Sequence, residues 1–255
     1  MPAEAIQLVP DFREKVWGAP LLEPWFPNPA PGTKTGEVWF SSPELPILVK
    51  FLFTTENLSV QVHPSGECGV GKTEMWHILR ADEGARIALG FREQVAEERA
   101  REAALSGEIE ELLQWYPVQA GETYFTPSGT VHAIGAGIAL CEIQQHSDIT
   151  YRLYDYGRPR ELHLDAGLAV AELGMHAGAP AGVASDDGWT RLVECEHFVT
   201  DARDVADGFH YRNAGAGPEL LIRTDGPGQV WLVPAGAELR LAPGVRRVLR
   251  TFLPA

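Results

Sequence analysis

Four side chains of types that commonly bind divalent metal ions lie in the first half of the chain: Gln61, His63, Glu74 and His132. Gln61 and His63 are separated by one residue, so on a strand their side chains point to the same face. Glu74 follows a glycine-rich loop that can return the chain antiparallel, and His132 begins another predicted strand. Two imidazoles, a carboxylate and an amide oxygen suit Zn²⁺, with Fe²⁺ or Mn²⁺ as alternatives. We therefore expect three strands to converge on one metal ion.

Basic residues are scarce in this sequence, yet several lie near the candidate ligands. Lys72 stands two residues before the candidate carboxylate ligand, and Arg152, Arg158 and Arg160 lie close together further along the chain. Such a cluster is what an anionic substrate requires, because charge-assisted hydrogen bonds from Arg and Lys are strong. The alternative is that these residues form ion pairs with the nearby carboxylates of Glu142, Asp148, Asp155 and Glu161.

One spacing pattern occurs twice, and only its first copy ends in a histidine. The two copies are Gly121, Pro127, Gly129 and His132, and Gly228, Pro234, Gly236 and Leu239. Each Pro-x-Gly follows an apolar strand pattern and predicts a tight turn into a return strand. The repeat indicates two similar β units, and its final residue predicts that only the first unit binds metal.

The rest of the chain predicts many short strands, in keeping with 26 Gly and 19 Pro spread along its length. The expected strands are 37–40, 47–54, 58–63, 75–79, 85–89, 123–126, 131–134, 138–144, 150–154, 191–194, 197–201, 220–224, 230–233, 238–241 and 248–252. Residues 92–116 instead predict two short helices, with a break at Ser106-Gly107 and an end at Pro117. The pattern of 164–173 fits helix or mixed structure, and 178–182 resembles a linker.

Composition limits the classes of partner. The formal net charge is −14 and the pI is about 5.0, which argues against nucleic-acid binding and against docking on anionic membranes. Cys68, Cys141 and Cys195 are odd in number and widely separated, so we expect free thiols in a reducing compartment. Because no signal peptide and no apolar run of about 20 residues is present, we expect a cytoplasmic protein whose partner is a small molecule.

Four longer motifs carry a resemblance to a known family. Residues 58–64, 71–76, 127–135 and 142–158 resemble, in order, those of class I mannose-6-phosphate isomerases in their short bacterial form. The resemblance implies a mainly β fold, a double cupin of two jelly-roll barrels with a short helical insertion. It further implies a catalytic metal-binding domain at 1–165, with the insertion at about 92–116, and a second, metal-free cupin domain at 166–255.

The resemblance also implies residue roles. One zinc ion per chain would be held by Gln61, His63, Glu74 and His132. Arg152 would be essential, and Lys72 and Glu142 match polar active-site positions. Lys72 and Arg152 would bind a sugar phosphate.

The implied reaction interconverts mannose 6-phosphate and fructose 6-phosphate by moving a proton between C1 and C2. Zinc would polarise the substrate oxygens, and Arg152 would stabilise oxyanion charge or bind the anionic end of the substrate. Glu142 and Lys72 are both candidates for the group that carries the proton. The alternatives are another metal-dependent cupin, such as an Fe²⁺ dioxygenase, and a non-catalytic cupin that binds sugar phosphates.

Overall fold

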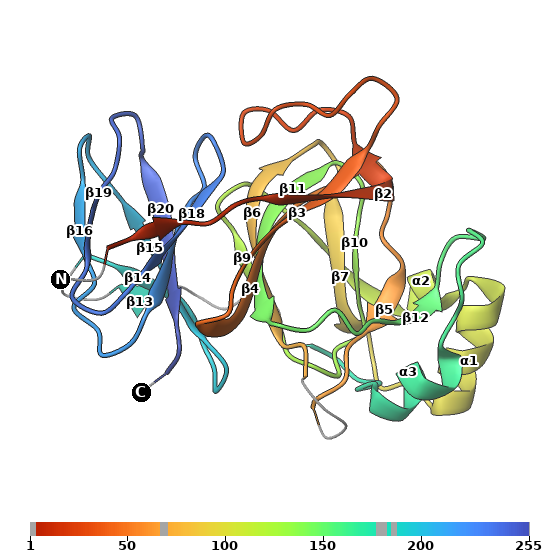
Figure 1. The fold of residues 1–255 in the computed structure, drawn as a ribbon. Coiled ribbons are helices and arrows are strands. Elements are labelled where there is room, and N and C mark those ends of the chain that lie inside the picture. The colour runs from red at the N-terminus through yellow and green to blue at the C-terminus, as the bar shows by residue number, and fades with distance from the viewer. Residues whose placement is uncertain (1–3, 67–70, 177–182, 185–187, 255) are drawn as a thin grey trace.

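The computed structural model describes residues 4–66, 71–176, 183–184 and 188–254. Two β barrels lie side by side, and the predicted mainly β, double jelly-roll fold is confirmed (Figure 1). Cys68 and the predicted linker at 178–182 lie outside the described residues. Cys141 and Cys195 are free, as predicted.

The first barrel consists of a six-stranded and a five-stranded sheet, both antiparallel. The six-stranded sheet has the order β2 (Asp11–Ala19), β3 (Thr35–Ser42), β4 (Leu45–Phe53), β11 (Ile138–Gln145), β6 (Glu74–Ala81) and β9 (Thr123–Thr126). The five-stranded sheet has the order β12 (Tyr151–Tyr154), β5 (Val60–Val62), β10 (His132–Ile134), β7 (Arg86–Phe91) and β8 (Leu113–Pro117).

The second barrel consists of a seven-stranded and a two-stranded sheet. The larger sheet has the order β1 (Ile6–Gln7), β18 (Gln229–Val233), β17 (Glu219–Arg223), β20 (Arg247–Phe252), β15 (Val199–Asp204), β14 (Thr190–Glu194) and β13 (Val183–Ala184). The smaller sheet pairs β16 (His210–Arg212) with β19 (Glu238–Arg240).

The helices lie at one end of the first barrel (Figure 1). They are α1 (Glu97–Ser106), α2 (Ile109–Leu112) and α3 (Leu164–Val170). The prediction that the second helix runs to Pro117 is wrong: the chain leaves the helix after Leu112 and forms β8, where Trp115 pairs with Ala88. Aromatic residues favour strands, and the edge of β7 offers them backbone partners. No helix in the described parts is long and apolar enough to cross a membrane.

Sequence patterns missed the N-terminal strand β2. Its sequence begins Asp-Phe-Arg-Glu-Lys and is largely exposed, so it lacks the apolar alternation of a half-buried strand. It nevertheless pairs with β3 as the edge strand of the six-stranded sheet. This position brings Arg13, Lys15 and Trp17 to the mouth of the first barrel.

The expected division into 1–165 and 166–255 stays a prediction, and two features bear on it. The expected boundary falls inside α3, which packs against β12 and β5 of the first barrel. At the other end of the chain, Ile6 pairs with Leu232, so the N-terminal strand belongs to the sheet of the second barrel. These contacts favour a boundary beyond α3.

One hydrophobic core joins the two barrels. The rings of Phe26 and Phe51 meet edge to face, and the same buried cluster includes Phe198 and Leu220 from the second barrel. Gly228 approaches so closely that an added Cβ would lie 2.3 Å from the Phe26 ring. The barrels are therefore expected to support each other's stability.

Replacing Phe26 with Ala tests this shared core. Phe26 is 5% exposed, and emptying such a site costs about 3–5 kcal/mol of unfolding free energy. We expect that loss in urea denaturation, whereas Leu105→Ala, at a side chain 67% exposed, should change stability by less than about 0.5 kcal/mol. Equal stability of the two variants would contradict a shared core.

Candidate metal centre and adjoining pocket

Three of the four predicted metal ligands converge inside the first barrel. His63 follows β5, Glu74 begins β6 and His132 begins β10. One ligand atom from each lies within 4.8 Å of the others, and all three side chains are buried. His63 Nε2 lies 3.6 Å from Glu74 Oε2, and His132 Nε2 lies 3.5 Å from Glu74 Oε1.

Backbone carbonyls hold both imidazoles in one tautomer. His63 Nδ1 donates to the carbonyl oxygen of Ile149 at 2.8 Å, and His132 Nδ1 donates to that of Thr130 at 2.9 Å. The lone pair of each ring is therefore on Nε2, the nitrogen that lies near Glu74. Burial lowers the pKa of His132 to about 4 and that of His63 well below its usual value, so both rings are neutral at pH 7. Neutral imidazoles with the second nitrogen fixed in this way are typical of metal ligands.

Glu74 supplies the negative charge of the cluster. Its Oε1 is buried without a hydrogen-bond donor, whereas Oε2 accepts from the Lys72 ammonium, which also lies 2.9 Å from His63 Nε2. Burial, followed by the repulsion of Glu142, raises the pKa of Glu74. A buried carboxylate that has one oxygen without a donor and lies near Nε2 of two neutral imidazoles fits a divalent cation.

Gln61 lies beside this cluster but turns its amide nitrogen toward it. Gln61 Nε2 donates to His132 Nε2 at 3.2 Å, and Ser59 Oγ donates to Gln61 Oε1 at 3.0 Å. Metal ligation through the amide oxygen requires a half-turn of the amide, after which the Ser59 hydroxyl accepts instead of donating. The residues therefore permit a four-ligand set and provide three ligands as they stand.

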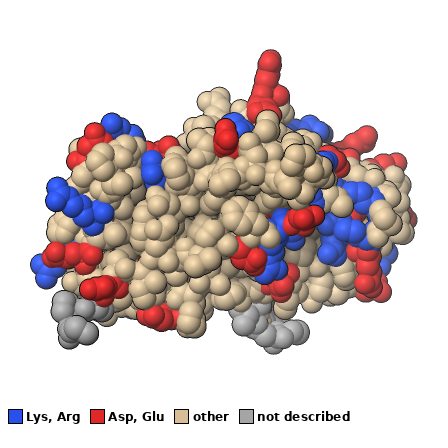
Figure 2. Space-filling view, turned by 45° about the horizontal axis from the view of Figure 1, so that its top comes forward, with Lys and Arg blue, Asp and Glu red and all other residues tan. Residues whose placement is uncertain are grey.

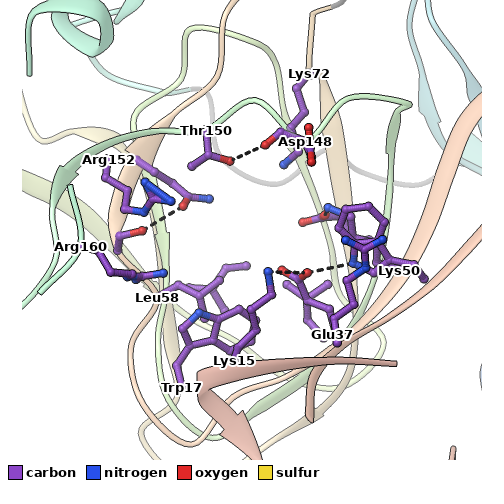
Figure 3. A pocket seen from close by; sticks show the side chains of 17 residues that line it. Lys15, Trp17, Glu37, Lys50, Leu58, Lys72, Asp148, Thr150, Arg152 and Arg160 are labelled. Carbon is purple, nitrogen blue, oxygen red and sulfur yellow. Dashed lines mark hydrogen bonds and ion pairs between the residues drawn. The ribbon is translucent and has the colours of Figure 1, made fainter. Parts of the chain in front are cut away.

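A polar cavity of about 290 Å³ opens beside the metal cluster (Figure 3). Six basic and three acidic residues line it, although the chain as a whole is acidic. The basic residues are Arg13, Lys15, Lys50, Lys72, Arg152 and Arg160, and the acidic residues are Glu37, Glu142 and Asp148. On the face seen in Figure 2, Lys and Arg side chains gather in the right-hand half of the molecule, with Asp and Glu among them. The cavity thus provides the local positive charge that an anion requires.

The predicted arginine cluster divides in the structure. Arg152 and Arg160 line one side of the cavity (Figure 3), whereas Arg158 does not line it. Arg158 and Arg160 both pair with the buried Asp155, as the ion-pair alternative predicted. Within the described residues, Arg152 has no carboxylate at ion-pair distance. Burial, followed by the repulsion of Arg160, lowers its pKa.

Glu142 occupies the opposite wall, between two donors. Lys50 Nζ lies 3.1 Å from Glu142 Oε1, and the Trp76 indole donates to Oε2 at 3.1 Å. Burial alone raises the pKa of Glu142, but Lys50 and then Lys72 outweigh it and the pKa falls to about 2. Glu142 is therefore an anion at pH 7.

Sequence reasoning missed several residues that line the cavity. They are Arg13, Lys15, Trp17, Glu37, Trp39 and Lys50. The sequence contained one signal for Lys50, because this charged residue interrupts the apolar run Ile47–Phe53 of β4. A lysine in the middle of a buried strand requires a partner, which points to a polar site on that face.

The second barrel repeats this framework without its two histidines. Thr130 N donates to the Pro127 carbonyl in the first repeated turn, and Ala237 N donates to the Pro234 carbonyl in the second. Strand pairings then align the metal-site positions of the two barrels. The counterparts of Gln61, His63, Glu74 and His132 are Tyr211, Asn213, Glu219 and Leu239.

The retained carboxylate of the second barrel has a different partner. Glu219 accepts a hydrogen bond from the Tyr211 hydroxyl. Leu239 offers no ligand atom where the first barrel has His132. Among the described residues, the cluster at Glu74 is the only group of three potential ligands that could hold a metal ion.

Comparisons with known proteins agree on one family. The chain is 34% identical to a mannose-6-phosphate isomerase of Streptococcus mutans and 35% identical to one of Bacillus subtilis, with 78% of each chain covered in both cases. A crystal structure of mannose 6-phosphate isomerase from Bacillus subtilis superposes with a TM-score of 0.84 at 27% identity, covering 98% of this chain and 100% of that one. A zinc-bound mannose 6-phosphate isomerase shares the fold, with a TM-score of 0.75 at 15% identity. No protein-family model matches.

The geometry predicts one divalent ion per chain. His132→Ala should lose the metal during dialysis, because removing one ligand of a small set weakens binding severely. His210→Ala, at an exposed histidine paired with Glu238, should retain one equivalent by elemental analysis. Two ions per wild-type chain, or full retention by His132→Ala, would contradict the assignment.

Proposed function

The chain belongs to the mannose-6-phosphate isomerase family, and we propose that it interconverts mannose 6-phosphate and fructose 6-phosphate in the cavity beside the His63–Glu74–His132 cluster. The observation that carries this proposal is the combination of a buried cation-binding cluster and a predominantly basic cavity in an acidic protein. A coupled assay for fructose 6-phosphate, started with mannose 6-phosphate, tests it. An active wild-type enzyme is expected.

We propose zinc as the cofactor, held by His63, Glu74 and His132, with Gln61 as a fourth ligand after rotation of its amide. When bound, zinc polarises carbonyl and hydroxyl oxygens of the open-chain sugar as a Lewis acid. The tautomers fixed by Ile149 and Thr130 support the assignment, because they leave the lone pair of each imidazole on Nε2, near Glu74. The Fe²⁺ dioxygenase alternative is disfavoured by family membership.

The residues of the cavity have distinct proposed roles. Glu142 is the base, because its carboxylate lines the cavity and proton transfer between C1 and C2 requires a group that can accept a proton. Lys72 supplies positive charge between the metal cluster and the cavity and stabilises the enediolate oxygens. Arg152 binds substrate oxygens, since its guanidinium reaches the cavity without a carboxylate partner among the described residues.

The non-catalytic alternative makes a different prediction from the same geometry. A cupin that only binds sugar phosphates needs the basic residues of the cavity but no ionised carboxylate among them. The cavity has both: Glu142 contacts Lys50, which lies across the cavity from Arg152 and Arg160 (Figure 3). Binding of mannose 6-phosphate without turnover would favour the non-catalytic alternative.

Phosphorylated mannose should react far better than free mannose. Each charge-assisted hydrogen bond contributes about 1.5–3 kcal/mol, so two such bonds favour the phosphorylated sugar by about 10² to 10⁴-fold in kcat/KM. The measurement compares the two sugars with the same enzyme preparation. Equal kcat/KM values would remove the case for an anion site in this cavity.

Arg152→Lys separates a functional from a structural arginine. Lysine cannot reproduce the planar fork of arginine, so we expect kcat/KM to fall by about 10²-fold while metal content and thermal stability stay unchanged. The matched control is Arg158→Lys, because Arg158 pairs with Asp155 and does not line the cavity. Near-normal activity of a folded, metal-replete Arg152→Lys enzyme would remove the proposed role.

A further inference from the structure

Four side chains form a continuous row across the six-stranded sheet. Trp39 on β3 pairs with Lys50 on β4, Lys50 pairs with Glu142 on β11, and Glu142 pairs with Trp76 on β6. Residues directly opposite each other on neighbouring strands project from the same face. Trp39, Lys50 and Glu142 line the cavity, and the two central members of the row carry opposite charges.

The contacts within the row fix the position of both charges. Lys50 Nζ lies 3.1 Å from Glu142 Oε1 and 4.5 Å from the centre of the Trp39 ring. The Trp76 indole donates a hydrogen bond to the other carboxylate oxygen of Glu142. The Lys50 and Glu142 side chains are each 5% exposed. An ammonium held by a carboxylate and by an aromatic face has little freedom to move. The carboxylate plane of Glu142 is consequently held from both ends.

Stability alone is a weak reason for such a pair. Moving two charges out of water costs about as much as their attraction returns, and a well-packed apolar pair in the same place is often at least as stable. The pair also lines the cavity that adjoins the metal cluster, and it includes the carboxylate that we assign as the base. A role in catalysis accounts for its position better than a role in folding.

We propose that Lys50 is a positioning residue that acts through Glu142, holding its carboxylate directed toward the carbon atoms of the substrate. The inference rests on the proposed isomerase function. Other charged groups that line this cavity near the pair are Arg13, which lies over the Trp39 ring, Glu37, which pairs with Lys15, and Lys72, which contacts Glu74. None of the three lies within ion-pair distance of Glu142 or Lys50, so each has a separate partner.

A double-mutant cycle tests whether Lys50 acts through Glu142. The four enzymes are the wild type, Lys50→Met, Glu142→Gln and the double variant, each assayed with mannose 6-phosphate after metal content and thermal stability have been measured. We expect Lys50→Met to lower kcat by about 10²-fold, within the range for general-base catalysis, and to change KM by less than about threefold. In the Glu142→Gln background, the same change should alter kcat by less than about threefold.

Two further variants control for folding and for loss of charge in general. Lys50→Arg retains the cation beside Glu142 and should keep kcat within about tenfold of the wild type. Lys34→Met removes a lysine that pairs with Glu56 outside the cavity and should leave kcat unchanged. If Lys50→Met does not fold, Glu142→Gln can still be compared with the double variant, which buries no unpaired charge. A further loss of kcat in the double variant would then contradict the inference.

Each result has a definite reading. A further tenfold loss in the double variant relative to Glu142→Gln would mean that Lys50 contacts the substrate directly, and would overturn the inference. Normal kcat in folded Lys50→Met would overturn it as well. Neither result affects the isomerase proposal, which fails only if the metal-replete wild type does not form fructose 6-phosphate.

Discussion

Two buried carboxylates, Glu74 and Glu142, set the main constraint on this structure. They project from neighbouring antiparallel strands into the interior of the first barrel, where an uncompensated charge costs several kcal/mol. Lys50 and Lys72 supply two compensating cations, and the arrangement of His63 and His132 around Glu74 provides for a third. The chemistry of the site follows from this need for charge compensation, since the same groups line or adjoin the predominantly basic cavity of the first barrel.

The two barrels share a framework but hold different residues at the positions of the metal site. Both use the same Pro-x-Gly turn, with Gly129 and Gly236 at positive φ, and both retain a glutamate at the equivalent strand position. In the second barrel, that glutamate accepts a hydrogen bond from Tyr211, which satisfies it without a metal ion. The second barrel instead contributes to the shared core around Phe26 and thereby supports the barrel that carries the site.

Local patterns predicted most of the fold, and residue type predicted the metal cluster. Strands with apolar alternation and the repeated turn were recognisable because they depend on short-range rules. The strand β2 and the residues of β8 were missed, since the first is polar and exposed and the second is held by pairing with β7. Lys50 was missed for a related reason: its role depends on its register opposite Glu142, which comes from strands distant in sequence. The separation of Arg152 from Arg158 likewise depends on where Asp155 lies in space.

The central claim is that a single zinc ion in the first barrel, next to the basic cavity, is where the sugar phosphate reacts. A crystal structure of the enzyme soaked with fructose 6-phosphate, with data collected on both sides of the zinc absorption edge, tests this claim most directly. The account predicts one anomalous peak, among His63, Glu74 and His132, with sugar density in the adjoining cavity that Arg152 and Glu142 line. A zinc peak in the second barrel, or sugar phosphate bound away from this cavity in an active enzyme, would contradict it.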